Sequence, residues 1–315
     1  MPATTTPEVA GTSGATSPTT SGPEGTPGTT GPNSGENPGR QDQVQASETL
    51  VPGAVDNTGG PLAQNRIVSY YGHPYSAAMG VLGQYEPQEM VALLKEQAAA
   101  YTAADPQRPA IPTIELIASV AQPEPGADGL YLNRTPPEVI EQYAKLAEEN
   151  DMLLLLDIQI GYSTIADEIE VLMPFLRRPY VHLAIDTEYD MAPGQIPGQQ
   201  VGASYATEIA SAAQTLSYIV EQEDLEAKVL VIHQFQYGMI LNKEILKPVE
   251  NVEMVLHADG FGPPQVKYDK YNALVTQEPI QYGGFKLFYS QDVPLLSPDQ
   301  VLSDLNPPPA VISYQ

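Results

Sequence analysis

The chain has 315 residues, and its 39 acidic against 14 basic residues give a formal net charge of −25. Nucleic acids and anionic membranes are bound through clusters of basic side chains, and no such cluster occurs here, so neither is an expected partner. Cysteine is absent, which excludes disulfide bonds, thiolate metal ligands and cysteine nucleophiles.

Residues 1–61 are rich in Thr, Ser, Pro and Gly and contain few large apolar side chains. Such a segment buries too little apolar surface to offset the entropy of ordering it, so we expect a disordered linker. Linkers of this composition often join a surface anchor to an exported domain, which favours an extracellular or cell-surface protein. The alternative is the tail of a cytoplasmic protein, because the sequence as written has no signal peptide and no apolar run of membrane-spanning length.

From residue 62 onward, short β-branched apolar runs alternate with stretches of helical periodicity, which predicts βα units on a parallel sheet. The expected strands are Ile67–Tyr71, Ile111–Val120, Met152–Ile160, Val181–Asp186, Lys228–Gln234, Val252–His257, Gly284–Tyr289 and Ala310–Tyr314. The expected helices are Pro87–Tyr101, Glu138–Asn150, Thr164–Leu176, Tyr205–Glu221, Lys243–Leu246, Val266–Leu274 and Pro298–Leu305.

Eight such units match the size of a (β/α)8 TIM-type barrel, the α/β fold that we expect for residues 62–315. The last strand leads into the end of the sequence, so the closing helix of the barrel is expected to be missing. An open doubly wound sheet is the alternative fold, although no strand end carries the glycine-rich phosphate turn of its nucleotide-binding members.

Carboxylates and imidazoles gather where the expected strands end, which in such a barrel is the rim that carries active sites. A buried strand gains little by ending in these groups unless they meet a polar partner or ligand. Three of the four histidines lie at or beside strand ends. The candidate site residues are Tyr71, His73, Asp157, Gln159, Asp186, Glu188, His233, Gln234, His257, Asp259, Lys286 and Tyr289.

Each candidate also has a structural interpretation, because strand-end acids cap helices and buried ion pairs occur in purely structural networks. His182, in the middle of a strand, is expected to be an interior histidine with satisfied hydrogen bonds. Lys286 lies inside an apolar strand and needs a partner, for which Asp259 is our hypothesis. Lys267 is expected to be a solvated lysine on a helix.

Asp186 and Glu188 lie two residues apart on the fourth strand and therefore on one face. A carboxyl group that donates a proton needs a raised pKa, and a second carboxylate nearby raises it by repulsion. The Asp-x-Glu sequence at the end of the fourth barrel strand resembles chitinase-type glycoside hydrolases and, more loosely, barrel-type lysozymes. The resemblance covers this one strand, and two further acids of the chitinase pattern are replaced by Val181 and Ala184.

This resemblance implies that Glu188 protonates the leaving group and that Asp186 is its partner, with Asp157 or Asp259 as the second carboxylate. The other candidates would bind a carbohydrate or another small polar ligand; they are Tyr71, His73, Gln159, His233, Gln234, His257, Lys286 and Tyr289. Tryptophan is absent, so tyrosines would have to supply the ring faces on which sugars stack. No cofactor is expected for this reaction.

Two functions of other classes fit the same residues. A metal-dependent hydrolase could take a divalent Zn, Mn or Mg ion from the imidazoles and carboxylates at the strand ends. Its ligands would come from His73, Asp157, Asp186, Glu188, His233, His257 and Asp259. The third possibility is a non-catalytic barrel that binds a ligand at the cell surface, because a fold alone does not determine function.

Overall fold

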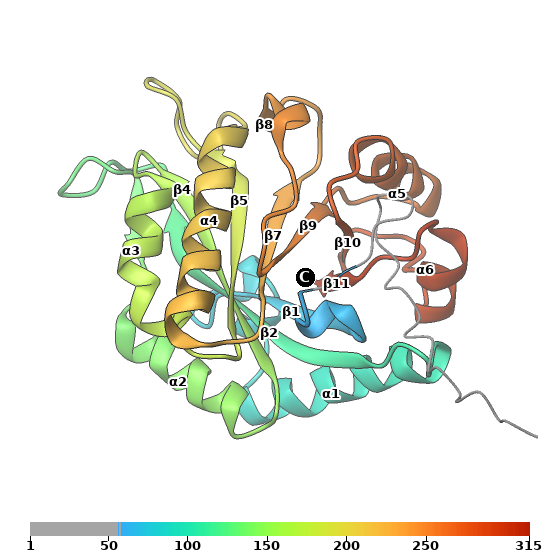
Figure 1. Ribbon diagram of the computed structural model, residues 1–315. Helices are drawn as coiled ribbons and strands as arrows, with labels where there is room; N and C mark the ends of the chain where they lie inside the picture. Colours follow the sequence, from blue (N-terminus) through green and yellow to red (C-terminus); the bar gives the residue numbers. More distant parts are fainter. Residues whose placement is uncertain (1–55, 57) are drawn as a thin grey trace, which may run out of the picture. The chain divides into compact units, whose positions relative to one another are not determined.

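The computed structural model describes Asp56 and residues 58–315, in which eight parallel strands close into a barrel surrounded by helices (Figure 1). Each strand pairs with the next along the chain, and the last pairs with the first, which confirms the predicted (β/α)8 fold. The strands are β1 (Arg66–Gly72), β2 (Ala110–Ala121), β4 (Leu153–Gly161), β5 (Val181–Asp190), β7 (Lys228–Gln234), β9 (Val252–Ala258), β10 (Tyr282–Leu287) and β11 (Val311–Tyr314).

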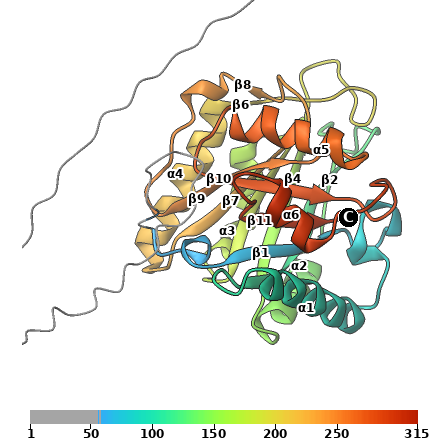
Figure 2. The same cartoon turned by 90° about the vertical axis from the view of Figure 1, so that its right-hand side faces the viewer.

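The helices lie on the outside of the barrel, as Figures 1 and 2 show from two directions. They are α1 (Pro87–Ala104), α2 (Pro137–Glu148), α3 (Ile165–Leu176), α4 (Ala206–Glu223), α5 (Pro264–Tyr271) and α6 (Pro298–Asp304). The expected helix at residues 243–246 is only a 3₁₀ turn, Lys243–Ile245, and α5 continues into a π-helical turn, Asn272–Thr276. β11 is followed by Gln315, the last residue of the sequence given. Among the described helices, none has both the length and the apolar character that crossing a bilayer requires.

Several short turns and strands lie outside the regular alternation of barrel strands and helices. Three further 3₁₀ turns span Pro61–Ala63, Ala77–Met79 and Val81–Gly83. β3 (Leu132–Arg134) pairs in antiparallel fashion with the end of β2, and β6 (Ser204–Tyr205) pairs with β8 (Ile240–Leu241). β3, β6 and β8 are not members of the closed ring of eight strands.

Apolar side chains fill two separate layers, because alternate residues of each strand point toward the helices or into the barrel. The larger layer lies between the strands and the helices. The smaller one fills the barrel interior with Leu62, Ile67, Leu155, Ala184, Val229, Val231, Val255, Tyr282, Ala310 and Val311. Strands buried on both faces need nearly continuous apolar runs, which explains why these runs were visible in the sequence.

The segment before β1 packs against the amino-terminal ends of the strands, which we call the base of the barrel. The backbone N–H of Leu62 donates to Glu253 Oε2 (2.9 Å), and Thr58 Oγ1 donates to Glu253 Oε1 (3.3 Å). The hydroxyl of Tyr282 donates to the carboxylate of Asp56. The packed part of the chain therefore includes Asp56 rather than starting at residue 62. The rest of the expected linker, residues 1–55 and 57, lies outside the described residues.

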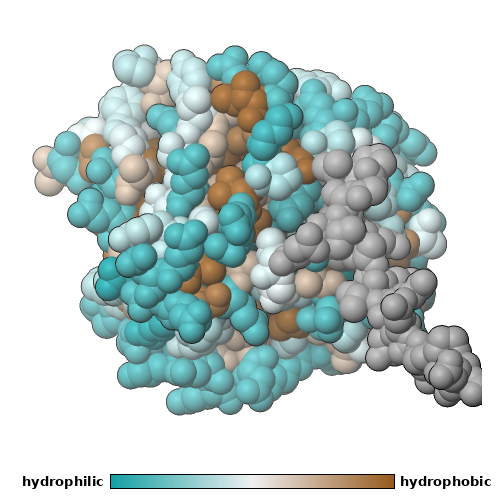
Figure 3. All heavy atoms as spheres, in the orientation of Figure 1, coloured by the Kyte–Doolittle hydropathy of each residue, from teal (hydrophilic) through white to brown (hydrophobic). Residues whose placement is uncertain are grey.

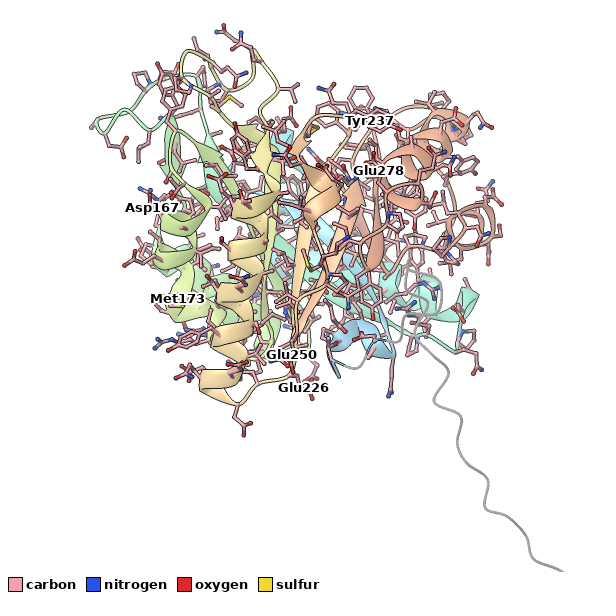
Figure 4. All side chains as sticks on the ribbon, turned by 45° about the horizontal axis from the view of Figure 1, so that its top comes forward. Asp167, Met173, Glu226, Tyr237, Glu250 and Glu278 are labelled. Carbon is pink, nitrogen blue, oxygen red and sulfur yellow. The ribbon has the colours of Figure 1, made fainter. Side chains whose placement is uncertain are left out.

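The carboxyl ends of the strands form the opposite rim. In Figure 4, Tyr237, which follows β7, lies at this rim, whereas Glu226 and Glu250, which precede β7 and β9, lie at the base. The apolar interior cluster occupies the lower part of the barrel, and the inward-facing residues above it are polar. The fold thus brings the strand-end residues of the sequence pattern together at one end of the molecule.

Candidate functional site

A cavity of about 460 Å³ opens at the rim, mainly at the ends of β5, β7, β9 and β10. It combines three acidic side chains, two lysines and five aromatic rings. Its lining residues are Tyr71, Asp186, Glu188, Tyr189, Phe235, Asp259, Gly260, Phe261, Lys270, Lys286, Phe288 and Gln315.

A layer of buried polar side chains lies directly beneath this cavity, one step above the apolar interior. Asp157, His233 and His257 each follow an interior apolar residue at a spacing of two, so strand alternation turns them inward. Glu115 enters the same layer from β2. The fold thus brings Asp157, His233 and His257 into one layer, and Asp259 at the upper edge of this layer joins the two histidines in a hydrogen-bond network.

Asp259 is the centre of that network. Its carboxylate accepts hydrogen bonds from His233 Nδ1 (2.9 Å) and from His257 Nδ1 (2.6 Å). It also accepts from Lys286 Nζ (3.2 Å), which confirms the bridge that the sequence suggested. The same lysine Nζ lies 3.5 Å from the centre of the Tyr71 ring, so the cation is held between a carboxylate and a ring face.

The network continues to both sides of Asp259. His233 Nε2 lies 3.1 Å from Glu115 Oε1, and Glu115 Oε2 accepts from Ser69 Oγ (2.6 Å). His257 Nε2 lies 3.2 Å from Ser313 Oγ. Carboxylates thus flank His233 on both sides, which favours the imidazolium form that carries a proton on each nitrogen.

In this network, pairing between a carboxylate and a neighbouring cation lowers the pKa of the carboxylate and raises that of its partner. Burial by itself would lower the pKa of His233, but the charge of Asp259 and the hydrogen bonds to Asp259 and Glu115 hold it well above its usual value. Burial would raise the pKa of Asp259, but His233 and then Lys286 hold it well below its usual value. Glu115 and Lys286 follow the same pattern, so two carboxylates face two cations.

Three other carboxyl groups have no cationic partner among the described residues. Burial, and then repulsion from Asp186, raise the pKa of Glu188 to about 7. Burial raises the pKa of Asp186 and, against the attraction of His233, raises that of Asp157 to about 8. Asp186 Oδ1 accepts from the backbone N–H of Glu188 (3.2 Å), while neither carboxyl oxygen of Asp157 has a hydrogen-bond partner in the described part of the chain.

These two kinds of carboxyl group give the cavity its chemistry. Near neutral pH, Glu188 can hold a proton at the cavity wall and release it, which is what a general acid requires. Asp259, which lines the same cavity, stays ionised. A pair of groups whose environments push their pKa values apart is the usual arrangement of an acid and its ionised partner.

Two of the candidate residues at strand ends tie loops together outside this cavity. His73 Nδ1 accepts from the backbone N–H of Tyr75 (3.3 Å), so its Nε2 carries the proton and donates to Thr135 Oγ1 (3.1 Å). Gln159 Oε1 accepts from the backbone N–H of Ala121 (2.8 Å), which links β4 to the end of β2. Neither side chain lines the cavity.

Two further candidates point away from the barrel interior. Gln234 donates to the carbonyl oxygen of Leu274 (3.0 Å) and accepts from Lys243 Nζ (3.1 Å). Tyr289 stacks on Tyr314 with ring centres 5.2 Å apart. Of the two residues proposed for the seventh strand, Lys286 and Tyr289, only Lys286 reaches the cavity.

The two remaining expectations from the sequence concern His182 and Lys267. His182 is an interior histidine, as expected, and its Nδ1 accepts from the backbone N–H of Val229 (3.1 Å). Its Nε2 is buried without a hydrogen-bond partner in the described part of the chain, so the expectation of satisfied hydrogen bonds holds for one of the two nitrogens. Lys267 is not solvated: it is buried and pairs with Asp292 (2.9 Å). Its ammonium also donates to the carbonyl oxygens of Gly260 and Lys286, so it fastens α5 to the rim.

Sequence reasoning named Tyr71 of the aromatic wall but missed its three phenylalanines and the role of Glu115. The aromatic wall consists of Tyr71, Tyr189, Phe235, Phe261 and Phe288. Phe235 and Phe288 directly follow β7 and β10, so their position at strand ends was a usable signal. Glu115 was conspicuous as a charged residue inside an apolar run, which by itself indicates a buried partner.

His233, His257 and Asp259 could also hold a metal ion, since one ligand atom of each lies within 4.8 Å of the others. Imidazole nitrogen and carboxylate oxygen are suitable ligands for Zn or Mn. A metal would have to replace the protons that both imidazoles share with Asp259, and it would lie close to the ammonium of Lys286.

Comparison with known proteins identified no relative: no protein-family model matches the chain, and no curated protein matches its sequence. A function for this site rests on its own geometry.

Proposed function

We propose that the protein is a glycoside hydrolase in which Glu188 protonates the leaving oxygen of a glycosidic bond. The observation that carries this proposal is a pair of carboxyl groups that line one cavity and have opposite pKa shifts. The pKa of Glu188 is raised to about 7, whereas that of Asp259 is held well below its usual value. Glycosidic bonds are cleaved by one carboxylic acid acting with one ionised carboxylate.

The other residues take supporting roles in this proposal. Asp186 keeps the pKa of Glu188 high and holds the Glu188 backbone through its hydrogen bond. Asp259 is the preferred second carboxylate, because Asp157 is fully buried and does not line the cavity. His233, His257 and Lys286 keep Asp259 ionised and fixed in place.

The aromatic wall suits a carbohydrate ligand. Ring faces next to a few directed polar groups are typical of small-molecule sites, and a sugar presents both an apolar face and hydroxyl groups. These rings take the place of the missing tryptophans. The Thr-, Ser- and Pro-rich composition of residues 1–61 is the basis on which we further propose an extracellular or cell-surface location.

Release of reducing ends from a panel of polysaccharides and peptidoglycan by the full chain tests this function. We expect Glu188→Gln to lower the rate by about 10²- to 10⁴-fold, the usual contribution of a general acid. Glu170→Gln removes the same charge from an exposed position on α3 and should leave the rate unchanged. Equal release by the native protein and Glu188→Gln would remove Glu188 from the mechanism.

A metal-dependent hydrolase is the second candidate, and the His233, His257 and Asp259 cluster favours it. Such an enzyme would copurify with a stoichiometric divalent metal and lose activity on treatment with a chelator. Binding of a saccharide without bond cleavage, unaffected by Glu188→Gln, would instead support a non-catalytic binding module.

A further inference from the structure

The two lysines that line the cavity, Lys270 and Lys286, already contact other groups of the protein. Lys286 pairs with Asp259 and lies over the ring of Tyr71. Lys270 Nζ donates to the carbonyl oxygen of Phe235 (2.8 Å). Each lysine of the cavity thus has a partner among the described residues, although only Lys286 pairs with an opposite charge.

Its negative charges, in contrast, are incompletely matched. Asp186 lines the cavity and is 7% exposed, yet among the described residues its carboxylate contacts no cation and accepts only from the backbone N–H of Glu188. Asp157 lies one step lower on the neighbouring strand, fully buried and with both oxygens unpartnered. Buried carboxylates cost free energy unless a cation or hydrogen-bond donors compensate for the lost water.

The aromatic wall supplies a second feature that attracts cations. The negative face of an aromatic ring binds ammonium groups, and the cavity already contains such contacts: Lys286 Nζ lies 3.5 Å from the ring centre of Tyr71 and 5.7 Å from that of Phe288, and Lys270 Nζ lies 5.7 Å from that of Phe235. The other two rings of the wall, Tyr189 and Phe261, also line the cavity. An acidic pocket with aromatic walls is suited to a ligand that carries positive charge and presents an apolar face.

We infer that the substrate is a saccharide bearing a protonated primary amine, which Asp186 and the aromatic wall bind. The saccharide part of this inference rests on the proposed function, whereas the ammonium part rests on the unmatched carboxylates. The net charge of −25 favours the approach of a cationic ligand, because it attracts cations over the distance that salt leaves unscreened.

Equilibrium binding to the full chain tests the inference with three ligands at mildly acidic pH. They are a fully deacetylated glucosamine oligosaccharide, its N-acetylated counterpart of equal length, and spermidine, which has ammonium groups without sugar rings. We expect the deacetylated oligosaccharide to bind at least about tenfold more tightly than the other two, with a preference that shrinks as salt is added.

Two variants of opposite charge change make the test specific. Asp186→Asn should reduce the preference for the deacetylated over the N-acetylated oligosaccharide. Lys270→Gln, which removes a positive charge from the same cavity, should increase that preference. Thermal unfolding of both variants checks that they are folded. Unchanged preference in both folded variants, or equal binding of the acetylated and deacetylated oligosaccharides, would overturn the inference.

The same samples separate this inference from the proposed function. Cleavage of acetylated or neutral glycans that depends on Glu188, without preference for the amine, would support the hydrolase and overturn the inference. Preferential binding of the deacetylated oligosaccharide without cleavage would support the inference and contradict the hydrolase. Tighter binding of spermidine than of either saccharide would overturn the saccharide part.

Discussion

Two acids that line one cavity, Glu188 and Asp259, hold their protons with very different strength. Neither difference comes from the residue type; both come from neighbours. Asp259 receives three hydrogen bonds from cationic or protonated groups, whereas Glu188 is half-buried beside Asp186 and forms no ion pair among the described residues. The neighbours thus assign opposite roles to two chemically equivalent groups.

The pH dependence of activity follows from the raised pKa of Glu188. A general acid works in its protonated form, so activity should fall as the pH rises through about 7, the pKa that burial and the charge of Asp186 produce. Asp186→Asn removes that charge, so the fall should move to lower pH. The measurement is kcat/KM against pH for both proteins; an alkaline limb that stays in place in the variant would contradict the assignment.

Removing the cation at Asp259 should weaken the fold. Lys286 is almost fully buried, and Lys286→Met would leave the buried Asp259 with less compensation; we expect a loss of about 3 kcal/mol in the free energy of unfolding. Urea unfolding measures it. Lys247→Met, at an exposed position, serves as the control and should change stability little. A Lys286→Met protein as stable as the native one would show that the ion pair is dispensable.

Predictions for single residues succeeded where the two-residue alternation of a strand determines which face of the sheet a side chain occupies. Asp157, Asp186, His233 and His257 face inward because each lies an even number of positions from an apolar interior residue. The same rule places Gln234, the neighbour of His233, on the opposite face. Partners across strands, such as the backbone N–H that Gln159 binds, depend on register, and one sequence does not encode register visibly.

At the scale of elements, all eight strands and the main helices were predictable, because buried parallel strands produce long apolar runs bounded by turn residues. The packed segment before β1 was not predictable. Its order comes from contacts with residues nearly 200 positions away, chiefly between Thr58 or Leu62 and Glu253, and its own composition resembles a linker. Local propensity gives no sign of such contacts.

Glu253 at the base should make stability depend on pH. Its burial, and then its hydrogen bond to Asp56, raise its pKa from 4.5 to about 9. The folded state therefore keeps a proton that the unfolded state loses, so this stability is complete below pH 4.5 and is lost as the pH rises toward 9. We expect Glu253→Gln to be about 1–3 kcal/mol more stable than the native protein at mildly alkaline pH.

The measurement is urea unfolding of both proteins across this pH range, in which the difference between them should grow with pH. Glu226→Gln, an exposed acid at the same end of the barrel, should show no such growth. A constant difference between Glu253→Gln and the native protein would mean that Glu253 is ionised in the folded state.

At the scale of the whole molecule, the acidic excess acts through the surface. The face seen in Figure 3 is mainly hydrophilic, and its apolar residues form small separate patches. A net charge of −25 favours solubility but works against compactness, because like charges repel one another.

Salt should therefore stabilise the protein. We expect the free energy of unfolding to rise by about 1 kcal/mol between low and moderate NaCl concentration, since screening weakens repulsion among exposed acids. A variant with Glu170, Glu226 and Glu250 changed to lysine carries less net charge and should gain less from salt. An equal gain in both proteins would point to a general salt effect on hydration.

The segment that begins at Asp56 joins the barrel at its base, while the cavity opens at the far rim. Attachment through the amino-terminal side of the chain, to a bead, a sensor chip or a fused protein, would therefore hold the molecule by the end remote from its ligand. The opening would face the solution, and large polymeric ligands could reach it without meeting the support.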